Sequence, residues 1–235
     1  ERILAKIESD PEPEGIKRTE KELWLNIKMK CLEGRRTGFG ITAEGDMLAA
    51  MGLTYGTDEA TAFAVEVQKT LACSAYRSSA LMARDRGAFP IYDYKLEENN
   101  PFIQRLKSAD EELYSLMKQY GRRNIALLTI APTGSVSICT QTSSGIEPAF
   151  LVSYRRRRKV NPNDSEATIS FTDDEGQAWE EYNVLHHKFA VWAEINGYNV
   201  ADLVHKYTDE QLQEVIAKSP YNNATANCVN WVNKV

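Results

Sequence analysis

The residues best suited to bind an anion follow a short apolar run. Residues 125–130 read as a buried strand, and the chain then passes through Pro132, Thr133, Gly134, Ser135 and Val136. Such a turn leads into a helix N-terminus, where backbone N–H groups lack helical partners and attract a phosphate or carboxylate. Gly134 lets an anion approach the backbone, and the hydroxyls of Thr133 and Ser135 add donors. The residues alone leave a phosphate site and a plain capped turn equally open.

Two further loops resemble binding motifs but favour other interpretations. Residues 142–148 combine hydroxyl groups, a glycine and one carboxylate, and a surface turn is the favoured interpretation. Residues 38–43 match the dinucleotide-binding pattern G-x-G-x-x-A, and Asp58 lies about as far on as the expected acidic residue. However, a predicted helix precedes residue 38 and Asp58 begins another helix, so a Rossmann site is not favoured.

Three clusters of reactive or charged residues are expected to be structural. Cys31 lies two residues before Glu33, but a cysteine on an amphipathic helix is expected in the core. His186 and His187 lack the H-E-x-x-H spacing of a metal site and are expected on a solvated helical face. The basic run 155–159 either meets an anion or forms an exposed strand whose charges prevent edge pairing. We therefore predict no catalytic residue and no metal ligand in this chain.

Composition excludes several classes of protein. The chain has 235 residues, of which 43% are hydrophobic and 26% charged, which is enough for a sizeable core, and no stretch approaches the roughly 18–20 apolar residues of a membrane-spanning helix. The net charge of −5 argues against a nucleic-acid surface. Four cysteines without a C-x-x-C pair fit a reducing cytoplasm. Because the sequence begins with Glu1 and shows no signal peptide, we expect a cytoplasmic piece of a longer protein.

Helical patterns dominate the first half of the chain. Two prolines between residues 10 and 15 predict a linker or partial helix over 1–16. Helices are predicted at residues 17–33, 46–51, from the N-cap Thr57 to about Gly87, and, after a capping box that begins at Ser108, up to Tyr120. The long third helix carries a face of small and apolar residues that would pack closely against a neighbour: Ala60, Ala64, Val67, Leu71, Ala75, Ser78 and Met82.

The second half of the chain is predicted to contain a hairpin and further helices. Residues 152–156 and 168–172 read as the two strands of the hairpin, residues 179–195 as a helix, and Thr208 begins a second capping box. The apolar run 125–130 is typical of a strand in a parallel sheet covered by helices, which indicates an α/β fold. We treat the chain as one fragment with segments 1–16 (linker or partial helix), 17–150 (helices, strands and the anion-binding turn), 151–175 (hairpin) and 176–235 (helical).

Two parts of the sequence resemble a known family. Residues 131–137 (APTGSVS) followed by 142–148 (TSSGIEP) are similar to the signature of the ribonucleotide reductase large chain, in its adenosylcobalamin-dependent class II form. Residues 35–41 (RRTGFGI) with 46–48 (DML) resemble a second block of the same family, in the same order and separation. The resemblance covers most of residues 20–235.

The resemblance implies a fold and an activity. The fold would be part of a ten-stranded α/β barrel, in which Pro132, Thr133, Gly134, Ser135 and Val136 hold the phosphates of the substrate. The activity would be radical reduction of ribonucleotides to 2′-deoxyribonucleotides for DNA replication, as in a vitamin B12-dependent ribonucleoside-diphosphate reductase. The implied cofactor is adenosylcobalamin, which we place on no residue of this chain. The implied partners are a ribonucleotide diphosphate or triphosphate, the remainder of the reductase chain and a thioredoxin-type reductant, with neither membrane nor nucleic acid.

One part of the family's machinery does not match. The family uses a thiyl radical on the cysteine of an Asn-x-Cys-x-Glu motif, whereas Cys31 is preceded by Met29, and Cys228 is followed by Asn230. We therefore expect the segment to follow the radical cysteine, to end before the closing strands of the barrel and to be inactive alone. The alternative is a non-catalytic helical interaction module, built on the small-residue face between Ala60 and Met82 and on the terminal helices.

Overall fold

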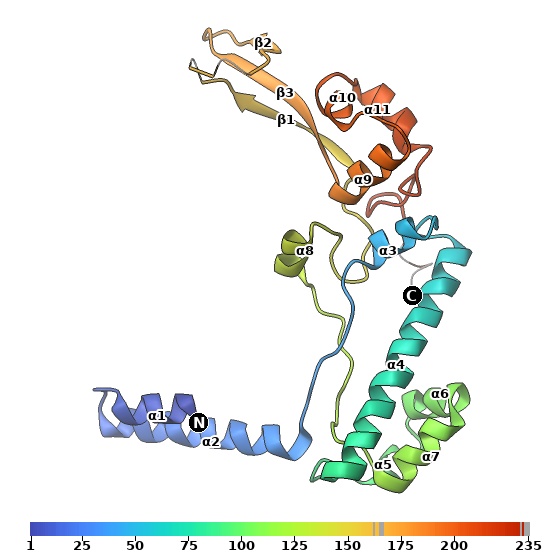
Figure 1. The fold of residues 1–235 in the computed structure, drawn as a ribbon. Coiled ribbons are helices and arrows are strands. Elements are labelled where there is room, and N and C mark those ends of the chain that lie inside the picture. Colours follow the sequence, from blue (N-terminus) through green and yellow to red (C-terminus); the bar gives the residue numbers. More distant parts are fainter. Residues whose placement is uncertain (162, 165–166, 231, 233–235) are drawn as a thin grey trace. The chain divides into compact units, whose positions relative to one another are not determined.

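The computed structural model describes residues 1–161, 163–164, 167–230 and 232, and it divides into two compact units (Figure 1). The first unit comprises residues 1–40 and 67–129, and the second comprises 41–66 and 130–235. The helices are α1 (Arg2–Ser9), α2 (Glu14–Gly34), α3 (Glu44–Ala50), α4 (Asp58–Arg86), α5 (Tyr94–Glu97), α6 (Pro101–Ala109), α7 (Glu111–Tyr120), α8 (Gly134–Thr140), α9 (His187–Ile195), α10 (Val200–His205) and α11 (Asp209–Ile216). The strands are β1 (Ser153–Lys159), β2 (Phe171–Thr172) and β3 (Ala178–Leu185), in the order β1-β3-β2.

The core of the first unit lies between α4, α6 and α7. Ala72, Tyr76 and Ala80 of α4 are buried and pack in one cluster with Ile103 and Leu113. The buried face of α4 therefore lies beside the predicted small-residue face. Of the predicted face, the structure buries Ala60, half-buries Ala64, Val67, Leu71 and Ala75, and exposes Ser78 and Met82.

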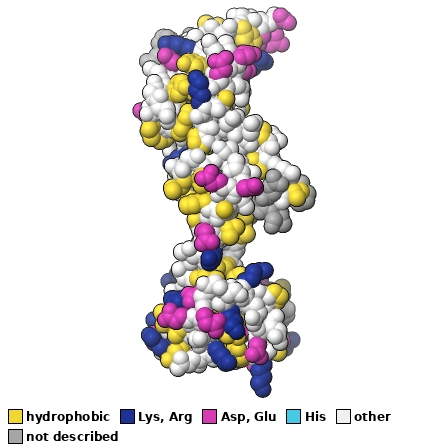
Figure 2. Space-filling model, turned by 90° about the vertical axis from the view of Figure 1, so that its right-hand side faces the viewer, with side chains coloured by type: hydrophobic (Ala, Val, Ile, Leu, Met, Phe, Trp, Pro, Cys, Tyr) yellow, Lys and Arg dark blue, Asp and Glu magenta, His cyan; other side chains and the backbone are white. Residues whose placement is uncertain are grey.

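Helix α2 differs from the partly buried helix that the sequence predicts. It pairs side by side with α1, which buries Ile7 (Figure 1). Most apolar side chains of α2 stay at the surface, including Leu23 at 56% and Leu32 at 49% exposure, and Cys31 is exposed as well. The prediction that Cys31 belongs to a core is therefore wrong within this structure. Figure 2 shows hydrophobic side chains at the surface in several places on the face that it presents.

The apolar run 125–130 forms less of a sheet than its composition predicts. It runs parallel to the extended residues 37–39, and the Phe39 amide donates to the Leu127 carbonyl at 2.7 Å. A side chain at Gly40 would overlap the Thr129 carbonyl oxygen, so this close approach requires glycine. The pairing counts only as an isolated bridge, and Ile130 is 69% exposed. The predicted strand with two buried faces is thus not observed, and the ten-stranded barrel remains a prediction.

The sheet of the second unit corrects the predicted hairpin. β1 pairs with β3 along its whole length, from Ser153 opposite Leu185 to Lys159 opposite Trp179, and β2 pairs with the far edge of β3. Residues 152–156 and 168–172 therefore do not pair with each other. Residues 179–185, predicted as helix, form the central strand, and the helix begins only at His187.

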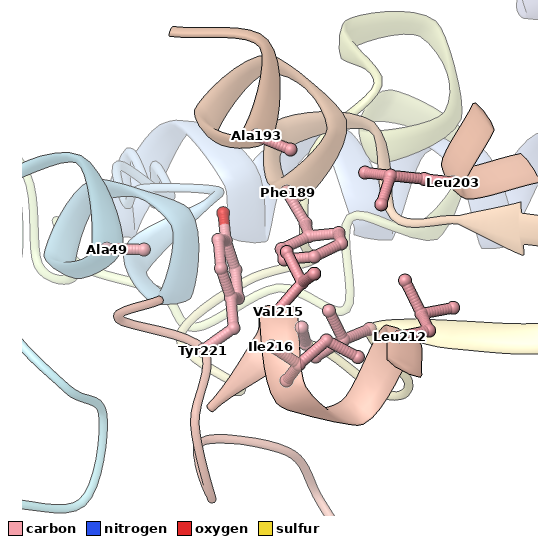
Figure 3. Close-up of a cluster of buried hydrophobic side chains, with 10 residues drawn as sticks. Ala49, Phe189, Ala193, Leu203, Leu212, Val215, Ile216 and Tyr221 are labelled. Atoms are coloured by element: carbon pink, nitrogen blue, oxygen red, sulfur yellow. The ribbon is translucent and has the colours of Figure 1, made fainter. Parts of the chain in front are cut away.

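The core of the second unit is a cluster between α9, α10 and α11 and the segment that follows them (Figure 3). Phe189 is fully buried, and the Tyr221 ring meets it edge-on at a centroid distance of 6.0 Å. In Figure 3 the Tyr221 ring stands between Phe189 and the helix that carries Ala49, which is α3. In this core α3, the start of α9 and the segment around Tyr221 pack against one another.

Candidate functional site

The predicted turn at Pro132–Val136 is exposed and begins α8. The backbone amides of Gly134, Ser135 and Val136 occupy the first turn of this helix and have no hydrogen-bond partner within the described residues. All three residues are exposed, and a Cβ atom at Gly134 would meet nothing within 4 Å. Three neighbouring N–H groups at the positive end of a helix favour an anion there. The turn therefore presents three amides without hydrogen-bond partners on exposed residues.

Thr133 holds this turn in an unusual conformation. It precedes α8 with φ 45° and ψ 24°, in the left-handed region that a residue with a branched Cβ rarely adopts. Its Oγ1 lies 3.0 Å from Oγ1 of Thr42 and accepts a hydrogen bond of 2.7 Å from the Gly145 amide. Two segments from elsewhere in the unit thus hold Thr133 in place.

The loop 142–148 is not the surface turn that the sequence favours. Ser143 and Gly145 are buried, and the Gly145 carbonyl accepts from the Glu44 amide at 3.1 Å. Oγ of Ser144 lies 3.1 Å from Oγ of Ser137 in α8. The loop therefore connects α3 to Thr133 and to Ser137 of α8. Its serine hydroxyls form hydrogen bonds inside the unit.

Asp46 joins this loop to the core of the unit. One carboxylate oxygen, Oδ2, accepts from the Ser143 amide at 2.7 Å, and the Asp46 amide donates to Ser143 Oγ at 3.2 Å. The other oxygen, Oδ1, accepts from His186 Nε2 at 2.7 Å and from the Tyr221 hydroxyl at 2.8 Å. Asp46 is only 6% exposed. A buried carboxylate thus ties together three segments that are distant in the sequence.

The environment of Asp46 keeps it ionised. Burial by itself raises the pKa of Asp46, but the hydrogen bonds from His186 and from the Ser143 amide outweigh this effect, so the pKa lies below its usual value of 3.8. Burial and the neighbouring Asp46 carboxylate raise the pKa of Tyr221. The Tyr221 hydroxyl is therefore a permanent donor, and Asp46 is a permanent acceptor near neutral pH.

Of the other candidates from the sequence, His186 contacts Asp46, whereas His187 and the basic run 155–159 are not among the hydrogen-bond partners of Asp46. His186 lies at the start of α9 with a 14% exposed side chain, so the expected solvated face is wrong for it, whereas His187 is exposed. The basic run 155–159 forms an exposed strand, where Arg157 pairs with Glu181 and Arg158 with Glu180 of β3. No group of three or more His, Cys, Asp or Glu side chains suited to a metal ion occurs among the described residues. No helix formed by the described residues is both long enough and apolar enough to cross a membrane.

Sequence reasoning found the exposed turn but missed the buried group around Asp46. The partners of Asp46 lie 97, 140 and 175 residues away in the chain, so no local spacing indicates them. The local signals are its place in the second family block and its position in the first turn of a short helix, where it complements the helix dipole.

Comparison with known proteins identifies the class of protein to which this fold and site belong. A family model described as ribonucleotide reductase, barrel domain, matches residues 23–225. The chain therefore belongs to the ribonucleotide reductase barrel-domain family, as the two sequence blocks around the turn predict.

Individual relatives match about half of the chain. The vitamin B12-dependent ribonucleoside-diphosphate reductase of Mycobacterium tuberculosis is 29% identical over 123 residues, which cover 52% of this chain and 15% of that protein. The enzyme of the same name from Thermoplasma acidophilum is 29% identical over 130 residues, which cover 55% of this chain and 15% of that protein. The ribonucleoside-diphosphate reductase subunit alpha of Treponema pallidum is 27% identical over 128 residues, which cover 53% of this chain and 15% of that protein. The match thus spans about 15% of the length of these relatives.

Proposed function

We propose that this chain supplies the substrate-phosphate site of a ribonucleotide reductase, which reduces ribonucleoside diphosphates to their 2′-deoxy forms by radical chemistry. Family membership supports the reaction, and the names of the relatives support the diphosphate substrate. The observation that carries the proposal is the set of three exposed, unpartnered amides at Gly134, Ser135 and Val136.

The turn would bind phosphate through its backbone. Each amide would donate to a phosphate oxygen, and the dipole of α8 would add a favourable field. Pro132 ends the extended segment before the turn, and Thr133 fixes the direction of the first helical amides. Because the backbone amides would contact only phosphate, the affinity of the turn would not depend on the base of the nucleotide. The turn would hold the nucleotide by its charged end and leave the ribose free for chemistry performed elsewhere in the enzyme.

The radical step is assigned to no residue of this chain. Cys31 is exposed on α2 and has Met29 in place of the asparagine of the family motif. The names of two relatives state a dependence on vitamin B12, so we propose adenosylcobalamin as the cofactor of the parent enzyme, place it on no residue of this chain and derive no step through it. The remainder of the reductase chain, a thioredoxin-type reductant and a cytoplasmic location complete the proposal.

The alternative of a helical interaction module has less support. It depends on the face of α4 between Ala60 and Met82. The most deeply buried side of α4, around Ala72 and Ala80, is instead covered by α6 and α7 of its own unit. Nothing in the described structure singles out the remaining face as a binding surface.

The proposal is tested by replacing Gly134. A Gly134→Val side chain has room in the fold but would crowd the amides, so binding of ADP by calorimetric titration should weaken about tenfold or more. Gly15→Val is the matched control, because Gly15 also lies in the first turn of a helix with nothing within 4 Å. Equal ADP affinity in both variants and in the unchanged chain would overturn the proposal.

A further inference from the structure

We propose that Asp46 is a positioning residue for the phosphate turn, and that it acts through the loop 142–148 without touching the ligand. That the ligand is a phosphate rests on the proposed function. The effect of Asp46 on the conformation of the turn can be tested with no ligand present. All the residues involved lie in the second unit.

The first link joins Asp46 to Ser143 in both directions. The Asp46 carboxylate accepts from the Ser143 amide at 2.7 Å, and the Asp46 amide donates to Ser143 Oγ at 3.2 Å. The first of these bonds is charge-assisted and buried, which makes it stronger than a bond between neutral groups. It fixes the backbone of the loop at Ser143.

The second link joins the loop to the turn. One residue past Ser143, the Ser144 hydroxyl lies 3.1 Å from that of Ser137 in α8. Two residues past it, the Gly145 amide donates to Thr133 Oγ1 at 2.7 Å. These contacts grip both sides of the first turn of α8, and Thr133 adopts a backbone conformation that it would not hold unaided. A displacement at Ser143 is therefore transmitted to the amides that follow Thr133.

The third link anchors Asp46 itself. His186 and Tyr221 donate to the carboxylate oxygen that faces away from Ser143, at 2.7 and 2.8 Å. Tyr221 belongs to the buried cluster of Figure 3, and His186 directly precedes α9 of the same cluster. The carboxylate thus bridges this buried core on one side and the loop on the other.

The test compares three variants of the chain by ¹H–¹⁵N correlation spectra, first alone and then with inorganic pyrophosphate. Asp46→Ala removes the acceptor of the Ser143 amide. Asp46→Asn keeps an oxygen that can face Ser143, because the Tyr221 hydroxyl can accept from the new amide group, and so can His186 Nε2 in the tautomer protonated on Nδ1. Glu180→Ala is the matched control, since Glu180 is a buried carboxylate of the same unit whose ion pair joins it to Arg158 and not to the loop.

We expect Asp46→Ala to move the amide resonances of Ser143, Gly145 and the turn residues 134–136 and to weaken pyrophosphate binding about tenfold, the effect of losing one hydrogen bond to a charged group. Asp46→Asn should restore most of this affinity. Glu180→Ala should lower stability but leave both the turn resonances and the affinity unchanged. Should the alanine chain not fold, Asp46→Asn alone carries the test. A neutral amide oxygen accepts a weaker bond from Ser143 than a carboxylate does, so we expect about threefold weaker pyrophosphate binding and resonance shifts confined to the loop and the turn.

The outcomes separate the two proposals. If the turn resonances of Asp46→Ala, or of Asp46→Asn where the alanine chain does not fold, match those of the unchanged chain, the positioning role is wrong, whatever pyrophosphate does. If they move but pyrophosphate never perturbs residues 134–136 of the unchanged chain, the phosphate site is wrong and Asp46 only shapes the turn. Equal effects of Glu180→Ala on the turn would show a general loss of stability and also overturn the positioning role.

Discussion

The backbone of Thr133 lies at φ 45°, a conformation that costs an L-residue about 1–2 kcal/mol. Glycine escapes this cost, but only a hydroxyl residue can make the two Oγ1 contacts with Thr42 and Gly145. The two Oγ1 contacts therefore hold Thr133 in a strained conformation, which fixes the direction of the amides that follow it. Strain of this kind is concentrated at functional sites, which agrees with the role proposed for the turn.

This balance predicts an order of stability at position 133. Thr133→Ala loses both hydrogen bonds and keeps the strain, whereas Thr133→Gly loses the bonds and relieves the strain. We expect both variants to be less stable than the unchanged chain, and the glycine variant to be more stable than the alanine variant by about 1–2 kcal/mol. Urea unfolding measures the order, and an alanine variant as stable as the glycine variant would contradict the left-handed conformation.

Asp46 should make the stability of the second unit depend on pH. Its pKa in the folded chain is lowered below 3.8, so the folded state binds its proton less readily than the unfolded state does. The contribution is fully present above pH 3.8 and is lost as the pH falls through the lower folded value. As the pH falls below about 4, the free energy of unfolding should therefore fall more steeply in the unchanged chain than in Asp46→Asn. Parallel curves would show that Asp46 is not preferentially ionised in the folded state.

At the scale of elements, the sequence predicts helix ends better than strand partners. The capping box at Thr208 is confirmed, with Thr208 and Gln211 exchanging hydrogen bonds at the start of α11. Thr57 also caps α4, and Gly121 ends α7, as predicted. These signals depend on residues a few positions apart, so local spacing carries them in full.

Strand pairing depends on distant residues and was predicted less well. The partner of β1 is β3, whose sequence WEEYNVL also fits a helix, and no local feature distinguishes the two. What favours the strand is the row of opposite charges across the pairing, such as Arg157 with Glu181 and Arg158 with Glu180. The partner can be recognised only once the two segments are known to be adjacent.

The start of α7 offers a direct test at this scale. The sequence places a capping box at Ser108, but the structure ends α6 at Ala109 and caps α7 with Asp110, whose side chain accepts from the Leu113 amide at 2.9 Å. Asp110→Ala should therefore cost about 1–2 kcal/mol in the free energy of unfolding, which includes its ion pair with Arg77. Ser108→Ala should change it by less than about 0.5 kcal/mol. Equal losses in urea unfolding would favour the sequence-based cap.

For the whole molecule, the family and the turn that begins α8 could be predicted, whereas the degree of burial could not. The resemblance is carried by two short sequence blocks, at residues 35–48 and 131–148, and the family model matches residues 23–225. Burial depends on what covers each face. The apolar residues of α2, such as Leu23, read as partly buried but lie at the surface of the described chain. An apolar pattern predicts that a face will be covered but does not name the covering segment.

The amides at the start of α8 are central to the proposed function. The most direct measurement is a crystal structure of the chain soaked with ADP. We expect density for the terminal phosphate with its oxygens about 2.7–3.1 Å from the amide nitrogens of Gly134, Ser135 and Val136. Phosphate density bound to another part of the chain, with the three amides facing only solvent, would contradict the central claim.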